Sequence, residues 1–382
     1  MPTALVICAA NPASDPRPHR MIRCLARDFR VSVLSRGQVE MPGVTCEQIP
    51  PLRPRSLARG VGNALRLKGG HYRHIVWTSG LREIAARHRR RAHEFIVVHD
   101  LRLLPVALAI RGRGPGRVLF DAREYYARHY EDLWWWRLLY QPMNRALCRR
   151  FMPRADHVVT VSDGLAAEYQ REFGVRCHVL PSLPAPRALE PRRVDPGQIR
   201  MIHHGLASPS RRLEGMIELM DHLPQVFSLD LMLVPANPGY LAKLQRLATG
   251  RRNVRVLPAV PFAQLIEVTN AYDIGLFLVP PVSFNLRFAL PNKFFEFVQA
   301  RLMVAIGPSP DMARYVREHD LGVVSADFRP ATLGSALARL STDDVARYKQ
   351  QAHRAAAVLN SDHTDAFVRA LALERTSTSV RA

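Results

Sequence analysis

Short apolar runs alternate with amphipathic segments along most of the chain. The runs are rich in Val, Ile and Leu, and polar turns or helical patterns separate them. Runs of this kind indicate parallel strands covered on both faces, and the segments between them indicate crossover helices. The expected strands lie at residues 4–10, 30–36, 94–100, 117–122, 156–162, 200–205, 228–234, 253–258, 273–279, 303–308 and 322–326. The pattern therefore predicts an α/β fold.

The alternation is interrupted once, by the proline-rich stretch at residues 180–198. At 382 residues the chain also exceeds the size that one hydrophobic core usually reaches. We therefore expect two Rossmann-like, doubly wound domains with ligands bound at the carboxyl ends of their strands. The predicted division is residues 1–185, a linker at 186–198, residues 199–361 and a last segment at 362–382.

Nothing in the composition points to secretion or to a membrane span, and we expect a cytoplasmic protein. Hydrophobic residues make up 47% and charged residues 23%, as in ordinary globular proteins. The five cysteines are scattered without a CxxC pair, which is typical of reduced thiols. No apolar stretch reaches the roughly 18 residues of a membrane span, and the first residues lack the basic leader of a secretory signal.

The charge is strongly basic and unevenly distributed. The net charge is +21; residues 1–186 hold 30 basic against 15 acidic residues, and residues 52–91 hold eleven basic residues against Glu83 alone. A patch of this kind suits nucleic acid, an anionic membrane surface or a phosphorylated small molecule, and it is also compatible with a solvated arginine-rich face. No recognised nucleic-acid module accompanies it, so we expect no nucleic-acid partner.

The clearest candidate chemistry lies at residues 288–300, where Lys293 is one of only four lysines in the chain. The pattern predicts a loop at 282–289 and a helix beginning at Pro291, so that the N–H groups of Asn292 and Lys293 form an anion site suited to diphosphate. Glu296 lies one turn further on, where a carboxylate can accept hydrogen bonds from two ribose hydroxyls. The alternative is an ordinary helix cap formed by Asn292 and Glu296.

Residues 273–311 resemble the nucleotide-sugar segment of the GT-B glycosyltransferases, particularly family 4, whose members read (P)xKxxE at this place. The resemblance implies two Rossmann-like domains facing each other across a cleft. It also implies that Glu296 binds ribose. Phe288 stands where the family usually has a glutamate linked to the donor sugar, so this chain departs from the pattern there.

Two further segments of the second half resemble the same family. Residues 199–224 are similar to the first strand, loop and helix of its second domain. There Gly205 closes the strand, and Arg211 or Arg212 matches the basic residue implied to hold the donor diphosphate. Residues 254–276 are similar to the segment whose backbone, near Val260, is implied to meet the base.

In the first half, residues 14–29, 120–132 and 155–175 resemble other segments of the family, with Arg123 standing where relatives have histidine. The candidates for catalytic roles end strands of this half: His99, Asp100, Asp121, Arg123 and Glu124. A structural cap is the alternative for each of them. The resemblance also implies that a last helix, at 362–374, returns to the first domain.

The activity that the resemblance implies is transfer of a sugar from a nucleotide-sugar donor to a glycan or lipid-linked acceptor, in polysaccharide biosynthesis, with retention of configuration. No metal or other cofactor is expected, because cations at 211, 212 and 293 already offset the phosphate charge and no DxD cluster is present. The patch at 52–91 and a helix at 134–151 mix aromatic residues with arginine, which suits the inner face of a cytoplasmic membrane. Because Trp134–Trp136 cannot share one helix face, at least one of them should be buried.

Two other functions stay open at this point. A nucleotide-sugar 2-epimerase would share the fold, although the replacements at Phe288 and Arg123 argue against the carboxylates and histidines that it needs. A basic nucleic-acid-binding protein is the second, on the strength of a pI near 10.8.

Overall fold

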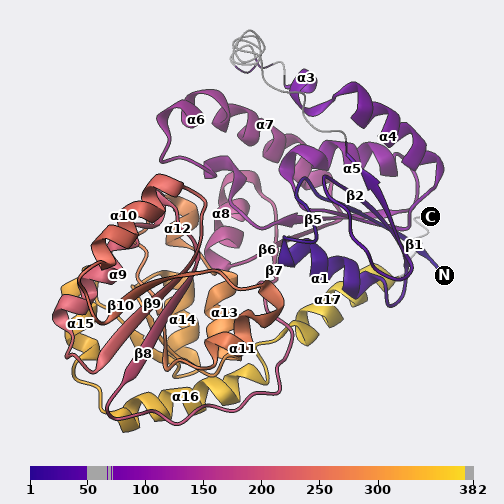
Figure 1. The fold of residues 1–382 in the computed structure, drawn as a ribbon. Coiled ribbons are helices and arrows are strands. Elements are labelled where there is room, and N and C mark those ends of the chain that lie inside the picture. The colour runs from indigo at the N-terminus through magenta and orange to yellow at the C-terminus, as the bar shows by residue number, and fades with distance from the viewer. Residues whose placement is uncertain (50–66, 68–69, 71, 375–382) are drawn as a thin grey trace. The chain divides into compact units, whose positions relative to one another are not determined.

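The computed structural model describes residues 1–49, 67, 70 and 72–374 (Figure 1). Most of the basic stretch at 52–91 that precedes residue 72 thus lies outside the described residues. The chain forms two compact units. Unit 1 comprises residues 1–181, 283–285 and 364 onward, and unit 2 comprises residues 182–282 and 286–363. Each unit is described by itself below.

Unit 1 is built on a seven-stranded sheet in the order β3-β2-β1-β4-β5-β6-β7. Its strands are β1 (Thr3–Ile7), β2 (Arg30–Ser35), β3 (Val44–Gln48), β4 (Phe95–Val98), β5 (Arg117–Ala122), β6 (His157–Thr160) and β7 (His178–Val179). All the pairings between these strands are parallel. The central strand β4 is completely buried, as expected for a sheet covered by helices on both faces.

The helices of unit 1 include one that comes from the end of the chain. They are α1 (Pro16–Leu25), α3 (Arg73–Val76), α4 (Ser79–Arg90), α5 (Leu104–Arg111), α6 (Trp134–Leu139), α7 (Gln141–Phe151), α8 (Asp163–Phe173) and, from residue 364, α17 (Ser361–Leu373). Short 3-10 turns lie at Leu101–Leu103, Tyr126–Arg128 and Met152–Arg154. From α17, Val368 and Leu371 join the core cluster of β1, β2 and α1, and Arg369 forms a bidentate ion pair with Asp28.

Unit 2 is built on a six-stranded sheet in the order β10-β9-β8-β11-β12-β13. Its strands are β8 (Ile199–Leu206), β9 (Phe227–Val234), β10 (Val254–Pro258), β11 (Ile274–Phe277), β12 (Met303–Ile306) and β13 (Gly322–Val324), and their pairings are all parallel. Two parallel α/β units confirm the predicted fold class.

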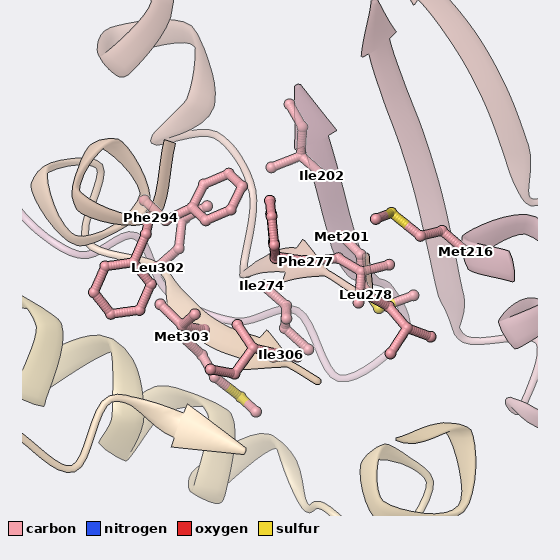
Figure 2. Close-up of a cluster of buried hydrophobic side chains, with 14 of the residues drawn as sticks. Met201, Ile202, Met216, Ile274, Phe277, Leu278, Phe294, Leu302, Met303 and Ile306 are labelled. Atoms are coloured by element: carbon pink, nitrogen blue, oxygen red, sulfur yellow. The ribbon is translucent and has the colours of Figure 1, made fainter. Parts of the chain in front are cut away.

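The helices of unit 2 pack on both faces of this sheet around one apolar core. They are α9 (Glu214–Leu219), α10 (Pro238–Ala248), α11 (Leu265–Thr269), α12 (Phe284–Arg287, which begins in unit 1), α13 (Asn292–Gln299), α14 (Pro310–Glu318), α15 (Pro330–Leu337) and α16 (Thr342–Ala356), with 3-10 turns at Pro209–Arg211, Met220–His222 and Phe262–Gln264. Figure 2 shows Phe294 of α13 gathered with Ile274 and Phe277 of β11 in this core. The buried aromatic side chains fix α13 against the sheet and hence fix where its polar residues lie.

Some elements differ from the prediction for identifiable reasons. The helix expected at 134–151 is divided at Tyr140 into α6 and α7, because Pro142 supplies no N–H for a continuous helix. Within α6, Trp136 is only 5% exposed while Trp134 is 68% exposed, so the expected burial of one tryptophan is confirmed. Among the described residues, no helix combines the length and apolar composition that crossing a membrane requires.

Two segments near the candidate site also differ. The loop expected at 282–289 contains the one-turn helix α12, since nothing in that stretch is Gly or Pro. The helix expected to begin at Pro291 begins at Asn292, with Pro291 extended at φ −76° and ψ 153° as its N-cap residue. The fixed φ of proline is compatible both with the first helical position and with the N-cap position. The extended ψ of Pro291 makes it the N-cap residue.

Candidate functional site

The carboxyl end of β8 forms the centre of the candidate site in unit 2. This strand lies between β9 and β11, and His203, His204 and Gly205 stand in succession just before its last residue, Leu206. Helix α13 brings Lys293 and Glu296 to the same place. Ligands of doubly wound sheets bind outside the carboxyl ends of the strands, so these residues stand where a ligand is expected.

Lys293 is held at this edge by a buried histidine. The Lys293 side chain is only 7% exposed, and its Nζ lies 3.2 Å from Nε2 of His203. Nδ1 of His203 lies 2.8 Å from the carbonyl oxygen of Leu276, which accepts a hydrogen bond and can donate none. Nδ1 therefore carries the imidazole proton, and Nε2 accepts a hydrogen bond from Nζ of Lys293. Nζ also lies over the ring of Phe277, 5.5 Å from its centroid, so the lysine has an apolar neighbour as well.

Gly205 forms the floor beneath two cationic groups. Its φ is +136°, and a Cβ atom there would lie 2.6 Å from Nζ of Lys293 and 3.1 Å from Nη1 of Arg211. A Cβ at this position would displace Nζ of Lys293 and crowd Nη1 of Arg211, and the positive φ favours glycine in any case. We call Gly205, Arg211 and Lys293 the cation cradle.

The electrostatics of the cradle favour an anion. Burial, together with the charge of Arg211, holds the pKa of Lys293 well below its usual value, while Glu296 acts in the opposite direction. Burial also lowers the pKa of His203, so its imidazole is neutral. An anion placed between Lys293 and Arg211 would offset the repulsion of the two cations and restore the protonated lysine.

Glu296 is a buried carboxylate beside a neutral histidine. It is 4% exposed, and its Oε2 lies 3.6 Å from Nε2 of His204. Burial, with Lys293 next, lowers the pKa of His204 to about 3, so this imidazole carries no charge near neutral pH. Nε2 of His204 has no hydrogen-bond partner among the described residues. The pair therefore presents polar atoms next to the cradle.

The other residues predicted for donor binding, Arg212, Asn292 and Val260, are not part of the cation cradle. Of the two arginines, the structure brings Arg211 to the cradle, whereas Arg212 is exposed and has a left-handed φ of +47°. Asn292, in the first turn of α13, is half-buried. Val260 is half-buried against the core of unit 2. Their predicted contacts with a nucleotide stay predictions.

Unit 1 contains a second polar cluster, at the carboxyl ends of β4 and β5. Asp121 is completely buried, and Arg17 of α1 donates to both of its carboxylate oxygens at 2.7 and 2.6 Å. Nδ1 of His99 lies 2.7 Å from Oδ2 of Asp121. Arg17 also donates to the carbonyl of Leu180 at 2.9 Å. The sequence prediction named His99 and Asp121, and the structure brings them together.

The ionisation of this cluster is fixed by its contacts. Burial opposes ionisation of Asp121, but the charge of Arg17 and the hydrogen bonds from His99 and Arg17 outweigh it and hold the pKa of Asp121 well below its usual value. The ionised carboxylate accepts a hydrogen bond from Nδ1–H of His99, which leaves Nε2 as the acceptor atom of the ring. That Nε2 atom is buried and has no hydrogen-bond partner among the described residues. It is chemically suited to accept a proton from a hydroxyl group.

The other residues predicted for catalysis in unit 1 have structural partners. Arg123 donates to Asp15 at 2.6 Å. Asp100 caps the 3-10 turn that follows β4, accepting a hydrogen bond from the N–H of Arg102 at 2.8 Å. Glu124 is half-buried, and its backbone carbonyl accepts from the hydroxyl of Tyr169. The structural alternative considered for Asp100 is therefore what the structure displays.

Sequence reasoning did not identify Arg17 or His203. Each acts on its partner across a long stretch of sequence: 104 residues separate Arg17 from Asp121, and 90 separate His203 from Lys293. A signal existed in the histidine pair that directly precedes Gly205 in an otherwise apolar strand. Within the described residues, no group of three or more His, Cys, Asp or Glu side chains is placed to hold a metal ion.

Comparison with known proteins gives one kind of match. No family model matches the chain, and no curated protein matches it. Solved structures match it over nearly its whole length. Sucrose-phosphate synthase from Thermosynechococcus elongatus is 13% identical, with a TM-score of 0.74 over 97% of this chain and 98% of that chain.

Two further solved structures match similarly. WaaG, a glycosyltransferase involved in lipopolysaccharide biosynthesis, is 14% identical, with a TM-score of 0.68 over 97% of this chain and 100% of that chain. HepE from Anabaena, solved in complex with UDP, is 11% identical, with a TM-score of 0.69 over 97% of this chain and 99% of that chain. At these identities the likeness establishes the fold, and it confirms the GT-B architecture that the resemblance predicted for this chain.

Proposed function

We propose that this protein is a glycosyltransferase that moves a sugar from a nucleotide-sugar donor to a glycan or lipid-linked acceptor. One observation carries the proposal: the cation cradle of Gly205, Arg211 and Lys293 at the carboxyl end of β8. It stands on a fold that HepE, solved with UDP, and WaaG, a glycosyltransferase, also have. A nucleoside diphosphate is the ligand whose charge and size suit such a cradle.

The cradle would bind the diphosphate of the donor. Arg211 offers a planar guanidinium that can hold two phosphate oxygens, and Lys293 offers a charge fixed by His203. The same two cations would stabilise the negative charge that grows on the diphosphate as the bond to the sugar breaks. This supply of positive charge is why the proposal includes no metal, and the nucleotide-sugar is treated as a substrate with no separate cofactor.

Glu296 would bind the ribose of the nucleotide. Its carboxylate is buried beside neutral His204, one turn into α13 from Lys293. The two oxygens of a carboxylate can accept hydrogen bonds from two adjacent ribose hydroxyls. The base would lie near the backbone at Val260 by the resemblance alone, and the N–H of Asn292 belongs to the anion site predicted for the diphosphate.

In the transfer step, the bond between the anomeric carbon and the donor phosphate breaks and a bond to the acceptor oxygen forms, while the acceptor hydroxyl loses its proton. His99 is the candidate to take that proton on Nε2, because Asp121 fixes its Nδ1 proton and stabilises the imidazolium that results. Retention of configuration is the outcome we propose, on the resemblance to family 4. Phe288 in place of the family's glutamate leaves the sugar open.

We further propose that the acceptor is presented at the inner face of a cytoplasmic membrane, for cell-surface polysaccharide. The support is chemical: Trp134, Trp135 and Leu138 are exposed on α6, and Arg89–Arg91 are exposed at the end of α4. Reversing the charges of Arg89, Arg90 and Arg91 should release the protein from anionic vesicles while leaving nucleotide binding intact, since each basic residue near such a surface contributes about 1 kcal/mol. Unchanged vesicle binding at low salt would remove this part of the proposal.

The rival reaction on the same fold is epimerisation of the nucleotide-sugar. It would need carboxylates and histidines around the sugar, and Phe288 and Arg123 stand at two of the relevant positions. Arg123 is engaged by Asp15, which makes it a fixed cation and not a group that exchanges protons. The products distinguish the reactions, because an epimerase keeps the nucleotide attached to the sugar and a transferase releases it.

A thermal-shift screen against nucleoside diphosphates and nucleotide sugars tests the proposal directly. A ligand at 100 times its dissociation constant should add about 2.7 kcal/mol to the free energy of unfolding. The stabilisation should disappear in the Lys293→Gln variant and persist in Arg246→Gln, which changes an exposed arginine of α10 outside the candidate site. Absence of stabilisation by every nucleoside diphosphate would contradict the proposal, and a positive screen names the donor base for product analysis.

A further inference from the structure

A cavity in unit 1 has no part in the function proposed above. It has a volume of about 690 Å³ and lies between α3, α5 and α7. Its lining includes Tyr72, Arg73, Trp77, Arg150, Phe151 and Arg154, and we call it the arginine pocket. Cavities that hold small molecules usually measure about 300–1,000 Å³, so this one is large enough for a ligand.

The pocket gathers positive charge. Among the described residues, its lining contains Arg73, Arg150 and Arg154 and no Asp or Glu. Elsewhere in unit 1, arginines are commonly paired, for example Arg111 with Asp156 and Arg145 with Glu172. In the described part of the chain, no carboxylate pairs with any of the three pocket arginines. All three side chains are exposed, so their guanidinium groups are open to an anion from solvent.

The rest of the lining is apolar and aromatic. The guanidinium carbons of Arg150 and Arg154 lie 5.5 and 5.7 Å from the ring centroid of Phe151, which holds both cations at one end of the lining. Buried Leu108 of α5 and Leu147 of α7 line the pocket from the core side. A ligand that fills this space needs an anionic group and a hydrocarbon part in the same molecule.

The pocket continues toward a basic surface. A second hollow of about 280 Å³ shares Arg73 and Trp77 with it and adds Arg82 and Arg89 of α4. On the other side, α7 leads back to α6, whose Trp134 is 68% exposed (Figure 1). Exposed tryptophan and arginine together are typical of surfaces that meet a lipid interface. The anionic amphiphile that such a surface would deliver is a phospholipid or another lipid phosphate.

We propose that the arginine pocket binds one lipid phosphate, with the phosphate among Arg73, Arg150 and Arg154 and the hydrocarbon against Leu108, Leu147 and the aromatic rings. The site is separate from the cation cradle, which lies in unit 2, and the inference does not depend on the proposed reaction. A transferase with a lipid-linked acceptor would use such a site to hold a lipid, but a lipid phosphate would bind there whatever the reaction is.

Calorimetric titration with dioctanoyl phosphatidate, kept below the concentration at which it forms micelles, tests this proposal. We expect one molecule to bind per chain. Replacing both Arg150 and Arg154 by glutamine should weaken binding about a hundredfold, roughly tenfold for each charge-assisted hydrogen bond lost. The matched control is the double variant Arg137→Gln and Arg149→Gln, which removes two exposed arginines of α6 and α7 outside the lining and should bind as the wild type does.

A second variant tests the cavity itself. Ala146→Phe places a ring in the pocket from α7 without removing a charge, and it should also abolish binding. Unchanged affinity in Ala146→Phe, or equal losses in both arginine pairs, would overturn the proposal. So would equal affinity for dioctanoyl phosphatidylcholine, whose headgroup has no net charge.

Inorganic phosphate distinguishes the two possible sources of the anion. Phosphate that binds as tightly as phosphatidate would show a simple anion site and overturn the lipid assignment. Nucleoside diphosphate titrations on the same variants separate this inference from the proposed function and also check that each variant is folded. Loss of phosphatidate binding with intact nucleotide binding concerns the arginine pocket alone, and the reverse concerns the cation cradle alone.

Discussion

Unit 2 buries two of the four lysines in the chain, and their surroundings differ in one respect. Lys349 of α16 is 1% exposed, and its Nζ lies 2.8 Å from Oδ1 of Asp273 and 3.0 Å from the carbonyl oxygen of Tyr272. Lys293 of α13 is 7% exposed, but its Nζ faces the neutral imidazole of His203, and the guanidinium of Arg211 also lies close to Gly205. One lysine has a carboxylate in contact, and the other has a second cation nearby.

The difference follows the two edges of the sheet. Asp273 directly precedes β11 at its amino end, where it also accepts from the N–H of Arg200, so Lys349 ties α16 to the sheet by a closed network. Lys293 stands at the carboxyl edge, where burial and Arg211 lower its pKa. A buried cation with an internal carboxylate serves the fold, whereas one beside another cation is poised for an external anion.

The largest expected effect is on the fold, from Lys349→Ala. Removing the lysine leaves the buried carboxylate of Asp273 without its ion-pair partner, which typically destabilises a protein by about 3–5 kcal/mol. Urea unfolding measures this loss. Affinity for a nucleoside diphosphate, measured where the variant is still folded, should equal that of the wild type. A variant that unfolds normally but binds no nucleotide would reverse the roles assigned to the two lysines.

Lys293→Gln should weaken nucleotide binding and leave the stability of the fold nearly unchanged, the opposite of Lys349→Ala. Loss of a charged donor should weaken nucleoside diphosphate binding by about 2–3 kcal/mol, while the free energy of unfolding without ligand should change little or increase, because a buried and electrostatically unfavourable charge is gone. Gly205→Ala should also weaken nucleotide binding, since its Cβ would displace Nζ, but the positive φ of this position means that it should destabilise the fold as well. Equal nucleotide affinity in wild type and Lys293→Gln would return Lys293 to a structural role.

These contrasts also show how far the sequence could lead. Buried runs of Val, Ile and Leu marked the central strands well, because a strand covered on both faces must be apolar throughout. They did not mark β3, which is half-exposed and includes Glu47, or β7, which has only two residues. Spacing and resemblance indicated Lys293, Glu296 and an arginine at 211 or 212. The contacts that give these residues their chemistry, from His203 and Gly205, depend on how β8 packs against α13.

Glu296→Ala tests the ribose site and should cost somewhat less than the loss of Lys293. Removing a charged acceptor should weaken nucleoside diphosphate binding by about 1.5–3 kcal/mol. The comparison that isolates ribose is with the same ligand lacking its 2′-hydroxyl, for which wild type and variant should differ less. Isothermal titration gives all four affinities. A penalty that is the same for both ligands would mean that Glu296 does not contact that hydroxyl.

Nucleotide binding should be coupled to proton uptake at Lys293. The pKa of Lys293 is lowered in the empty cradle and is expected to rise when an anion binds, so affinity is highest below the lowered pKa and falls as pH increases through it. The groups facing Nζ are His203 and His204, both neutral, together with Arg211 and Glu296. Without ligand, the unfolded state binds more protons between the two pKa values, so this group makes the protein more stable as pH rises there.

Calorimetry in two buffers of different ionisation enthalpy counts those protons. The measurement belongs above pH 8, where the ligand's own phosphate, with a pKa of about 6, is already fully ionised. Wild type should take up a fraction of a proton per nucleotide, and Lys293→Gln should take up none. Equal proton uptake in the two proteins would place the titrating group outside the cradle.

The smallest expected effect comes from substitutions of His203. This histidine is the hydrogen-bond partner of Lys293, as Asp273 is of Lys349, so it tests the contrast between the two lysines most specifically. If His203 positions Lys293 by accepting its hydrogen bond, His203→Leu should weaken nucleoside diphosphate binding by about 1 kcal/mol, the usual value of one hydrogen bond. His203→Gln keeps a carbonyl oxygen near the place of Nε2 and should recover most of that loss. A purely structural role would lower the free energy of unfolding of both variants and affect the nucleoside and its diphosphate equally. The decisive quantity is therefore the difference in binding free energy between the nucleoside diphosphate and the nucleoside. For the positioning role to stand, His203→Leu must reduce that difference and His203→Gln must recover it.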